Sequence, residues 1–296
     1  MNCGSTSVQR VPMREIEDRE TIAPVYDLPP LTRRKGFFHR KTVRRALPWF
    51  VIIMMFVVWE LFVRALSIQQ FVLPAPSVIF ESLWTWRVPI LENALQTLMT
   101  TLVGFAFAIV IGAIGGIALG SSSVIYEGFY PALIAFNSVP KVAVIPVLVI
   151  WFGIGTVPAI ITAFLLSFFP ILVNVATGIA TVEPELRDVL RALGATRRQV
   201  IMKVGLPRAM PYFFASLKIA MTVAFVGSIV AETVAANAGI GHLMLVASSR
   251  FDVPIVFAGL IVTGLMGVGM YVVCVAVEQR MTGWATRGAE GVTFAN

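Results

Sequence analysis

The sequence is poor in charge and in cysteine. Lys, Arg, Asp and Glu together make up 13% of its 296 residues, whereas hydrophobic side chains make up 57%. Soluble domains contain roughly 25% charged and about 45–50% apolar residues, so this composition excludes a soluble globular domain and a disordered chain. The only cysteines are Cys3 and Cys274, and their spacing provides neither a disulfide framework nor a metal site.

Two further features are missing. No Gly-Lys dipeptide occurs, and a P-loop needs a Gly-Lys-Ser/Thr step to hold phosphates, so the chain is not expected to be an ATPase. The first 45 residues contain no apolar stretch. We therefore expect no cleavable signal peptide, and we expect the first apolar helix to remain as an anchor.

Long uncharged runs dominate what is present, and a membrane-spanning helix needs about 20 predominantly apolar residues. The sequence predicts an all-α membrane protein with about six transmembrane helices. The predicted spans are residues 46–66, 93–126, two within 128–182 that a turn at 152–158 divides, 211–235 and 253–277. Residues 67–92, with their prolines and tryptophans, are predicted to form an external interfacial segment.

Small residues and prolines predict details of these spans. Gly112, Gly116 and Gly120 recur every four residues, which favours a smooth face that another helix can approach closely. Four prolines, at positions 131, 140, 146 and 170, are expected to kink or interrupt the spans between 128 and 182. Such breaks survive in lipid only where protein or a water-filled cavity satisfies the freed backbone groups.

The distribution of Lys and Arg predicts the orientation. With the N-terminus in the cytoplasm, the segments on that side hold eighteen Lys and Arg, and the opposite side holds two. This bias indicates that both termini are cytoplasmic. The predicted organisation is a basic tail over 1–45, the first span, the external segment, a core of five spans over 93–280 and a cytoplasmic tail over 281–296. The basic tail either contacts an anionic leaflet or is a solvated leader.

The one long charged interior segment, residues 183–208, is predicted to form two short helices. Pro184 and Glu185 suit a first helical turn, and an apolar stripe recurs at Leu186, Val189, Leu190 and Leu193. Gly194 is a natural C-terminal stop. Thr196 and Gln199 resemble a capping box for a second helix, which Gly205 and Pro207 are expected to end before the membrane. Such an amphipathic helix either docks on a cytoplasmic partner or lies on lipid headgroups.

This segment resembles the EAA loop of bacterial ABC importer permeases. That loop has the pattern E-A-A, three residues, Gly, nine residues and I-x-L-P, and its positions fall here on Asp188, Val189, Leu190, Gly194, Val204, Leu206 and Pro207 with every spacing kept. The departures are Asp for Glu, Val and Leu for the alanines, and Val for Ile. The similarity spans roughly residues 70–285 and includes LPAPSVI, VPKVAVIPVLVIWFGIGTVP, FFPILVN and VAETVAANAGIGHLM, which are similar to the aliphatic sulfonate, taurine and nitrate branch of the binding-protein-dependent transport inner membrane component family.

The resemblance implies a type I ABC importer permease fold in the bacterial inner membrane. It implies a second permease copy, two cytoplasmic ABC ATPase subunits that dock on the loop, and an external solute-binding protein. The solute would be a small organic or inorganic anion, or a related small solute. The chain itself would be no enzyme, would bind no cofactor, metal or nucleic acid, and would leave ATP and Mg to the partner. The implied coupling residues are Glu185, Leu186, Arg187, Asp188, Val189, Leu190, Arg191, Leu193, Gly194, Ala195, Leu206 and Pro207.

Ionisable residues inside the predicted spans need a reason, because a charge at bilayer depth costs about 2.5–3.5 kcal/mol on insertion scales. Glu60 and Arg64 are four residues apart and can pair. Lys141 either contacts an anionic solute on the translocation path, or snorkels, or pairs with an internal carboxylate. Glu232 is either a gate contact or the partner of Lys141. A local hydrogen bond is expected for His242.

Two other function classes remain alternatives. An ion-gradient-driven secondary transporter would need carboxylates within the spans, for which Glu60 and Glu232 are the candidates. An intramembrane hydrolase would need a Ser/His pair, but Ser228 lies in no G-x-S-x-G context and His242 stands alone. No inverted repeat supports the secondary transporter, and the hydrolase would leave the charged loop unexplained, so the importer permease is the favoured prediction.

Overall fold

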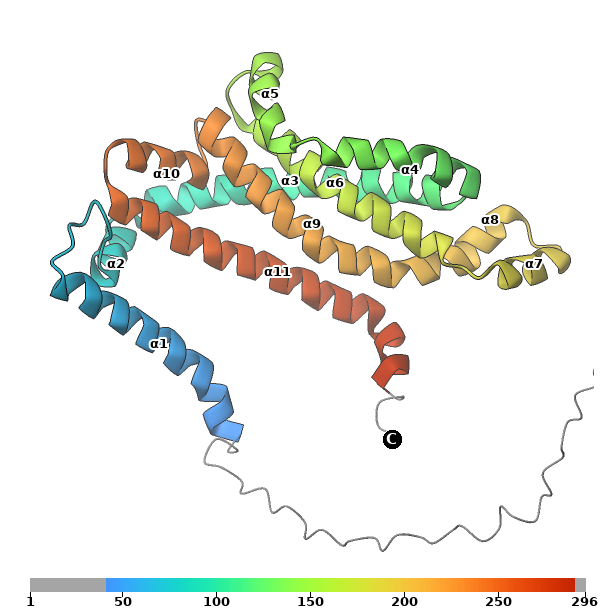
Figure 1. The fold of residues 1–296 in the computed structure, drawn as a ribbon, viewed down its shortest axis with the longest axis horizontal. Helices are drawn as coiled ribbons and strands as arrows, with labels where there is room; N and C mark the ends of the chain where they lie inside the picture. The colour runs from blue at the N-terminus through green and yellow to red at the C-terminus, as the bar shows by residue number, and fades with distance from the viewer. Residues whose placement is uncertain (1–40, 291–296) are drawn as a thin grey trace, which may run out of the picture. The chain divides into compact units, whose positions relative to one another are not determined.

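The computed structural model describes residues 41–290 (Figure 1), so most of the predicted basic tail lies outside the described residues. This part of the chain is helical and contains no strand, which confirms the all-α prediction. The helices are α1 (Lys41–Ala65), α2 (Pro76–Thr85), α3 (Arg87–Gly120), α4 (Ser123–Ser138), η2 (Lys141–Val144), α5 (Ile145–Phe152), α6 (Thr156–Ala180), α7 (Pro184–Ala192), α8 (Arg197–Val200), η3 (Ile201–Gly205), α9 (Leu206–Ala235), α10 (Ile240–Ser249) and α11 (Val253–Glu290). The chain divides within α1 into two compact units, 1–54 and 55–296, and the packing below is that of the second.

Five of the described helices are long and apolar enough to cross a membrane. They are Leu47–Ala65, Arg87–Gly120, Thr156–Ala180, Arg197–Ala235 and Val253–Thr282. A sixth span exists if the bent pair of Val124–Ser138 and Lys141–Phe152 crosses as one, with an angle of 73° between its halves. This agrees with the prediction of about six spans.

The bend between α4 and α5 lies where one of the four prolines was expected to break a span. Val139 and Pro140 are extended, and the chain resumes as the short 3-10 helix η2. Pro146 lies in the first turn of α5, where its missing N–H breaks no helical hydrogen bond. Pro131 and Pro170 lie inside α4 and α6 without ending them. The bend is therefore set at Pro140.

The helix of the second predicted span, residues 93–126, differs at both ends: α3 runs from Arg87 to Gly120, and α4 already begins at Ser123. The Trp86 amide closes α2 by donating to the Ser82 carbonyl, and the Trp86 carbonyl then accepts from Ile90 at 2.9 Å. Pro89 lies in the first turn of α3, where a helix tolerates proline. The charges of Arg87 and Glu92 kept this turn out of the predicted span, although they are compatible with a helix that begins at the membrane surface.

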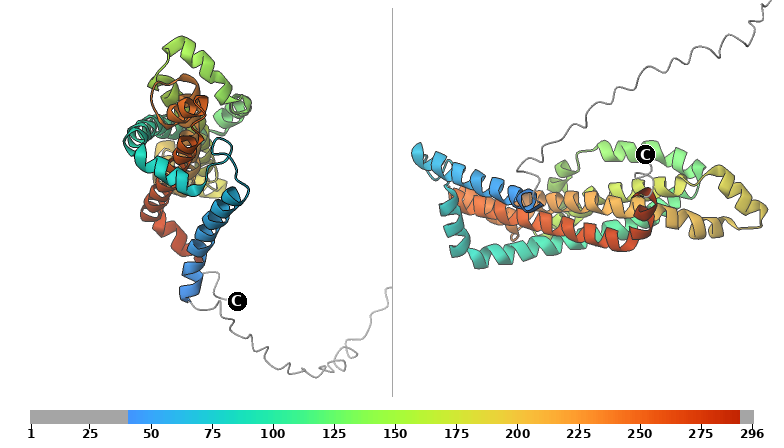
Figure 2. Two further views of the ribbon diagram at one scale, coloured as in Figure 1. Left: turned by 90° about the vertical axis from the view of Figure 1, so that its left-hand side faces the viewer. Right: turned by 90° about the horizontal axis from the view of Figure 1, so that it is seen from below.

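The core of the second unit is formed by α3, α6 and α9 (Figure 1), and α11 runs along α9 (Figure 2). The glycine face of α3 packs against α6, as its four-residue spacing predicted. A Cβ placed on Gly116 would lie 2.6 Å from the Val175 Cβ and 2.7 Å from the Leu172 carbonyl oxygen. The two backbones approach too closely for any larger residue there.

Replacing Gly116 with leucine should lower the free energy of unfolding of the detergent-solubilised protein by about 1–3 kcal/mol, the cost of an overpacked contact. Its unfolding temperature should fall accordingly. The matched control is Gly264→Leu on α11, because no atom lies within 4 Å of a Cβ at that glycine. Thermal unfolding of both variants checks the prediction. An equal effect of the two substitutions would contradict the packing argument.

Candidate functional site

The helix α7 ends in two hydrogen bonds that reverse the chain. The Gly194 amide donates to the Arg191 carbonyl at 2.9 Å, and the Ala195 amide donates to the Leu190 carbonyl at 2.9 Å. This pair of bonds is a Schellman motif. Gly194 adopts a φ of +82°, a conformation that glycine reaches without a Cβ penalty. The predicted stop at Gly194 is confirmed.

The apolar stripe of α7 is partly buried against the rest of the chain and partly exposed. Leu186 and Leu190 are half-buried, whereas Val189 is 56% and Leu193 79% exposed. Large apolar side chains on an otherwise polar helix leave a surface that a partner can cover. Ala195 is half-buried at the turn that follows.

The charged side chains of α7 lie beside this apolar surface. Asp188 and Arg191 are both exposed and lie 3.8 Å apart, and Glu185 is an acidic residue in the first turn. The side chain of Arg187 lies outside the described residues. The helix α7 thus carries exposed charged side chains, Glu185, Asp188 and Arg191, beside the exposed apolar Val189.

The second helix begins with the predicted capping box but does not end where expected. The Thr196 amide donates to the Gln199 Oε1 at 2.8 Å, and the Gln199 amide donates back to the Thr196 Oγ1 at 3.4 Å. The ending predicted at Gly205 and Pro207 is wrong, because residues 197–235 form one continuous helical run. The π-helical turn η3 precedes Pro207 in the first turn of α9, where a missing N–H is tolerated. Leu206 is half-buried there and Pro207 is exposed.

Arg197 links this segment to the cytoplasm-facing end predicted for α3. Its guanidinium donates to the carbonyl oxygen of Ser121, which directly follows α3, through Nη2 and through Nε at 3.2 Å. The last carbonyls of a helix lack partners within it, and a cation is favoured at this negative end of the helix dipole. A second link, between Arg208 and Glu183 at 3.6 Å, joins the first turn of α9 to the residue before α7.

Lys141 lies in η2, at the bend between α4 and α5, and is 9% exposed. Its Nζ donates to the Asn137 Oδ1 at 2.9 Å and to the Asn137 carbonyl at 3.1 Å. The rings of Phe136 and Phe169 lie 5.7 and 6.0 Å from the ammonium. Both hydrogen-bond acceptors are neutral, and none of the ion pairs among the described residues includes Lys141.

Glu232 does not pair with Lys141. It is 1% exposed, and its carboxylate accepts from the Thr97 hydroxyl at 2.7 Å, the Thr100 hydroxyl at 3.2 Å and the Gly241 amide at 3.2 Å. Thr100 in turn contacts Ser228 at 2.7 Å. The Lys141 alternative is therefore wrong, and the carboxylate belongs to a buried network between α3, α9 and α10.

This network caps the N-terminal end of α10. The amides of Gly239 and Ile240 donate to the Asn93 Oδ1 and the Thr97 Oγ1, each at 2.8 Å, while the third amide donates to Glu232. These amides would otherwise lack partners. His242 is half-buried one residue later, and the described residues contain no group of metal ligands.

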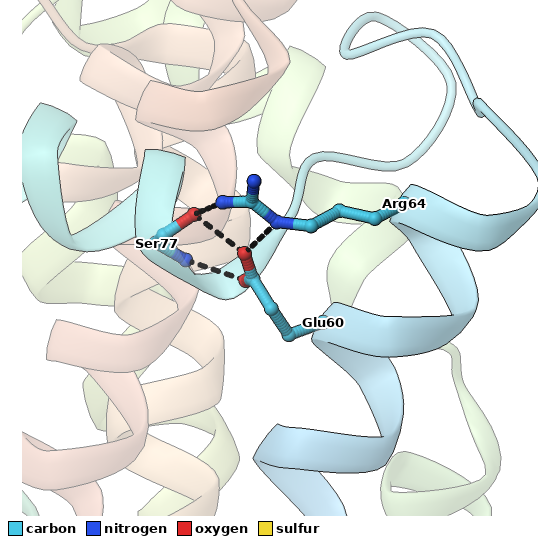
Figure 3. Close-up of polar contacts among 3 residues, drawn as sticks. All are labelled: Glu60, Arg64 and Ser77. Atoms are coloured by element: carbon cyan, nitrogen blue, oxygen red, sulfur yellow. Dashed lines mark hydrogen bonds and ion pairs between the residues drawn. The ribbon is translucent and has the colours of Figure 1, made fainter.

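The predicted Glu60–Arg64 pair is confirmed and has a third member (Figure 3). Arg64 Nε lies 2.5 Å from the Glu60 Oε1, and both side chains reach Ser77 in the first turn of α2. The Glu60 carboxylate accepts from the Ser77 amide at 3.0 Å and from its hydroxyl at 2.9 Å. Glu60 therefore caps α2, and its charge is favourable at a helix N-terminus.

The contacts of Arg197, Thr97 and Ser77 were not found from the sequence. Each joins residues that are distant in the chain, by 76, 135 and 17 positions respectively. The only local signals were two: the basic Arg197 directly after the Thr196 cap, and Ser77 directly after Pro76. No periodicity identifies the partner of such a side chain.

The comparisons with known proteins decide the family. Residues 104–283 match the family of the binding-protein-dependent transport system inner membrane component. The chain belongs to this family. It is thus an importer permease of the ABC transporter type, a membrane transport subunit.

Relatives of this permease cover most of its length. The formylaminopyrimidine transport permease protein ThiX of Halalkalibacterium halodurans is 29% identical over 80% of this chain and 95% of its own. The riboflavin transport system permease protein RibX of Chloroflexus aurantiacus is 30% identical over 79% and 88%. The taurine transport system permease protein TauC of Escherichia coli is 28% identical over 77% and 85%.

The solved structures show that the permease has the expected fold. A chain of the MetNI methionine ABC transporter in an inward-facing conformation aligns with a TM-score of 0.59 and 19% identity. The alignment covers 66% of this chain and 97% of that one. The type I importer permease fold predicted from the EAA-like segment is therefore confirmed.

Proposed function

We propose that the permease couples ATP hydrolysis by a separate cytoplasmic subunit to solute movement through α7 and the turn at Gly194. The observation that carries this proposal is the exposure of Val189 and Leu193 on a charged helix outside the spans. Burial of apolar surface in a groove of a partner, with charged flanks fixing its register, is the helix-in-groove mode of recognition. Two such ATPase subunits, which use ATP and Mg, would bind the loops of two permease copies.

The contacts of the loop support a mechanical path into the spans. From Arg197 the helix continues without a break into α9, so a displacement of the loop moves α9 directly. Arg197 also holds the end of α3 through Ser121. Because α3, α6 and α9 pack together, a pull on α7 would rotate these three helices as a body. Such rocking between inward-facing and outward-facing states is alternating access.

An external binding protein would deliver the solute. Two copies of the permease would assemble in the bacterial inner membrane, with both termini of each copy in the cytoplasm. The bias of Lys and Arg supports this orientation. The named solutes of the relatives, formylaminopyrimidine, riboflavin and taurine, are small polar organic compounds. We propose a small anion, such as a sulfonate or nitrate-like ion, or a related small solute.

Lys141 is the proposed contact for a negative charge on the path, because its ammonium has only neutral partners in the chain. Glu232, for which the sequence left a gate contact as an alternative, is hydrogen-bonded within the capping network of α10. We therefore propose a positioning role for Glu232 and keep solute contact for Lys141.

Changing Lys141 to methionine should reduce uptake of an anionic solute by about tenfold, the equivalent of one charge-assisted hydrogen bond. The amount of protein in the membrane should not fall, because methionine removes a buried charge without adding volume. Uptake into proteoliposomes and immunoblots of the membrane fraction measure the two quantities. Lys141→Arg keeps the charge and should retain most uptake; equal uptake by the methionine variant and the wild type would remove Lys141 from the path.

The proposal as a whole is tested by copurification. An ATP-binding subunit should copurify with the permease from gently solubilised membranes and should be lost when Asp188, Leu190 and Gly194 are changed together. The matched control changes Glu81, Glu92 and Gly264, which lie outside the loop. Failure to recover an ATPase with the wild type under several gentle detergents would favour the ion-driven alternative.

The ion-driven transporter has little support from the carboxylates it would need. Glu60 is bound by Arg64 and Ser77, and Glu232 by hydroxyl and amide donors. Each carboxylate fixes a helix end. ATP dependence of uptake in proteoliposomes separates the two functions.

A further inference from the structure

A groove of about 440 Å³ lies between α2, α3 and α11. The groove is lined by Phe80 and Trp84 of α2, Leu91 of α3 and Val262 of α11, among other residues. Every side chain that lines the groove is apolar except Arg87. The coupling loop and the Lys141 bend contribute no residue to it, so the proposed function leaves this feature unexplained.

The walls of the groove are held in place by contacts of their own. The Glu60 and Arg64 side chains fix the first turn of α2 through Ser77 (Figure 3). Further along α2, Ile79 is completely buried in a cluster with Ile90 and other residues of α3, α10 and α11. A short surface helix fixed at both its capped end and its buried face keeps the groove open without a ligand.

Arg87 carries a charge that no carboxylate among the described residues neutralises. Its Nη1 donates to the Trp84 carbonyl at 2.8 Å, and its guanidinium lies 4.8 Å from the centre of the Trp84 ring. A guanidinium has five N–H donors, so most of them remain available. The stacking and the one hydrogen bond orient these donors at the rim of the groove.

The position of Arg87 also matters, because it is the first residue of the span Arg87–Gly120. The end of an apolar span lies at the boundary between hydrocarbon and headgroups, and tryptophans such as the exposed Trp84 and Trp86 are typical of that level. The groove thus extends from a cation at headgroup level along apolar side chains into the hydrocarbon region.

We propose that this groove is a binding site for an anionic phospholipid. One acyl chain lies along Phe80, Leu91 and Val262, and the phosphate accepts hydrogen bonds from the free N–H groups of Arg87. The charge selects for the occupant, since the guanidinium forms charge-assisted hydrogen bonds with a phosphate and attracts a headgroup of net negative charge more strongly than a zwitterionic one. The site is independent of the coupling function and of the solute.

The test is native mass spectrometry of the delipidated full chain titrated with dioleoyl phosphatidylglycerol or with dioleoyl phosphatidylcholine. The wild type should bind phosphatidylglycerol about tenfold more tightly than phosphatidylcholine, and Arg87→Gln should abolish this preference. The matched control is Arg250→Gln, because Arg250 is an exposed arginine in the turn before α11. This control should bind like the wild type.

A second variant tests the groove in case the Arg87→Gln protein does not fold. Leu91→Trp adds bulk to the wall along which the acyl chain lies, at a side chain that is itself exposed. It should weaken retention of both lipids while leaving the headgroup preference intact. The proposal is overturned if Arg87→Gln retains the wild-type preference, or if the wild type binds both lipids equally. It is also overturned if Leu91→Cys, in a background without Cys3 and Cys274, crosslinks between two copies in membranes, since a second copy would then cover the groove.

Discussion

Replacing Gly194 with valine is expected to lower ATP-driven uptake by about tenfold or more while the protein still inserts in the membrane. The φ of +82° is strained for a β-branched residue, at a cost on the order of 1–3 kcal/mol. No atom lies within 4 Å of a Cβ at this position, so the effect comes from the backbone and not from a clash. The turn between α7 and α8 would open, and α7 would lose its direction relative to α9.

The control for this prediction is Gly194→Asn, because asparagine tolerates the left-handed region and substitutes for glycine at helix ends. It should retain most uptake. Uptake into proteoliposomes containing the ATPase and the binding protein, together with ATP hydrolysis in the same samples, checks both variants. Normal uptake by Gly194→Val would contradict the role of the turn.

Replacing Glu232 with leucine is expected to destabilise the protein by on the order of 3 kcal/mol. The carboxylate is 1% exposed and receives bonds from Thr97, Thr100 and Gly241. Its removal leaves buried donors without an acceptor, at about 1–3 kcal/mol for each group that finds no new partner. The loss of stability concerns α10, because this network caps the first amides of that helix.

Thermal unfolding in detergent measures this effect, with two comparison variants. Glu232→Gln keeps the shape of the side chain and one acceptor oxygen, so it should lower the free energy of unfolding clearly less than the leucine variant does. Glu81→Leu removes an exposed carboxylate on α2 and should remain within about 0.5 kcal/mol of the wild type. If the leucine variant unfolds at the wild-type temperature, the capping network does not stabilise α10.

Local patterns sufficed for several elements of the proposed coupling loop. The capping box at Thr196, the glycine stop at Gly194 and the small face of α3 all depend on residues within one turn or on a fixed helical spacing. The sequence failed at the ends of α3 and of the second loop helix. There, charged residues and Pro207 suggested a break, but the first turn of a helix accepts proline and charge, so the helices continue.

The amino-acid sequence by itself determined the class of protein, the all-α fold and the segment that resembles the EAA loop, because hydropathy, length and residue spacing are properties of the chain alone. Tertiary structure decided the partners of the buried charges. Whether Glu232 would meet Lys141 or cap α10, and whether Arg197 would reach α3, depends on which helices lie side by side. That arrangement brings together residues more than 70 positions apart, and no local pattern encodes it.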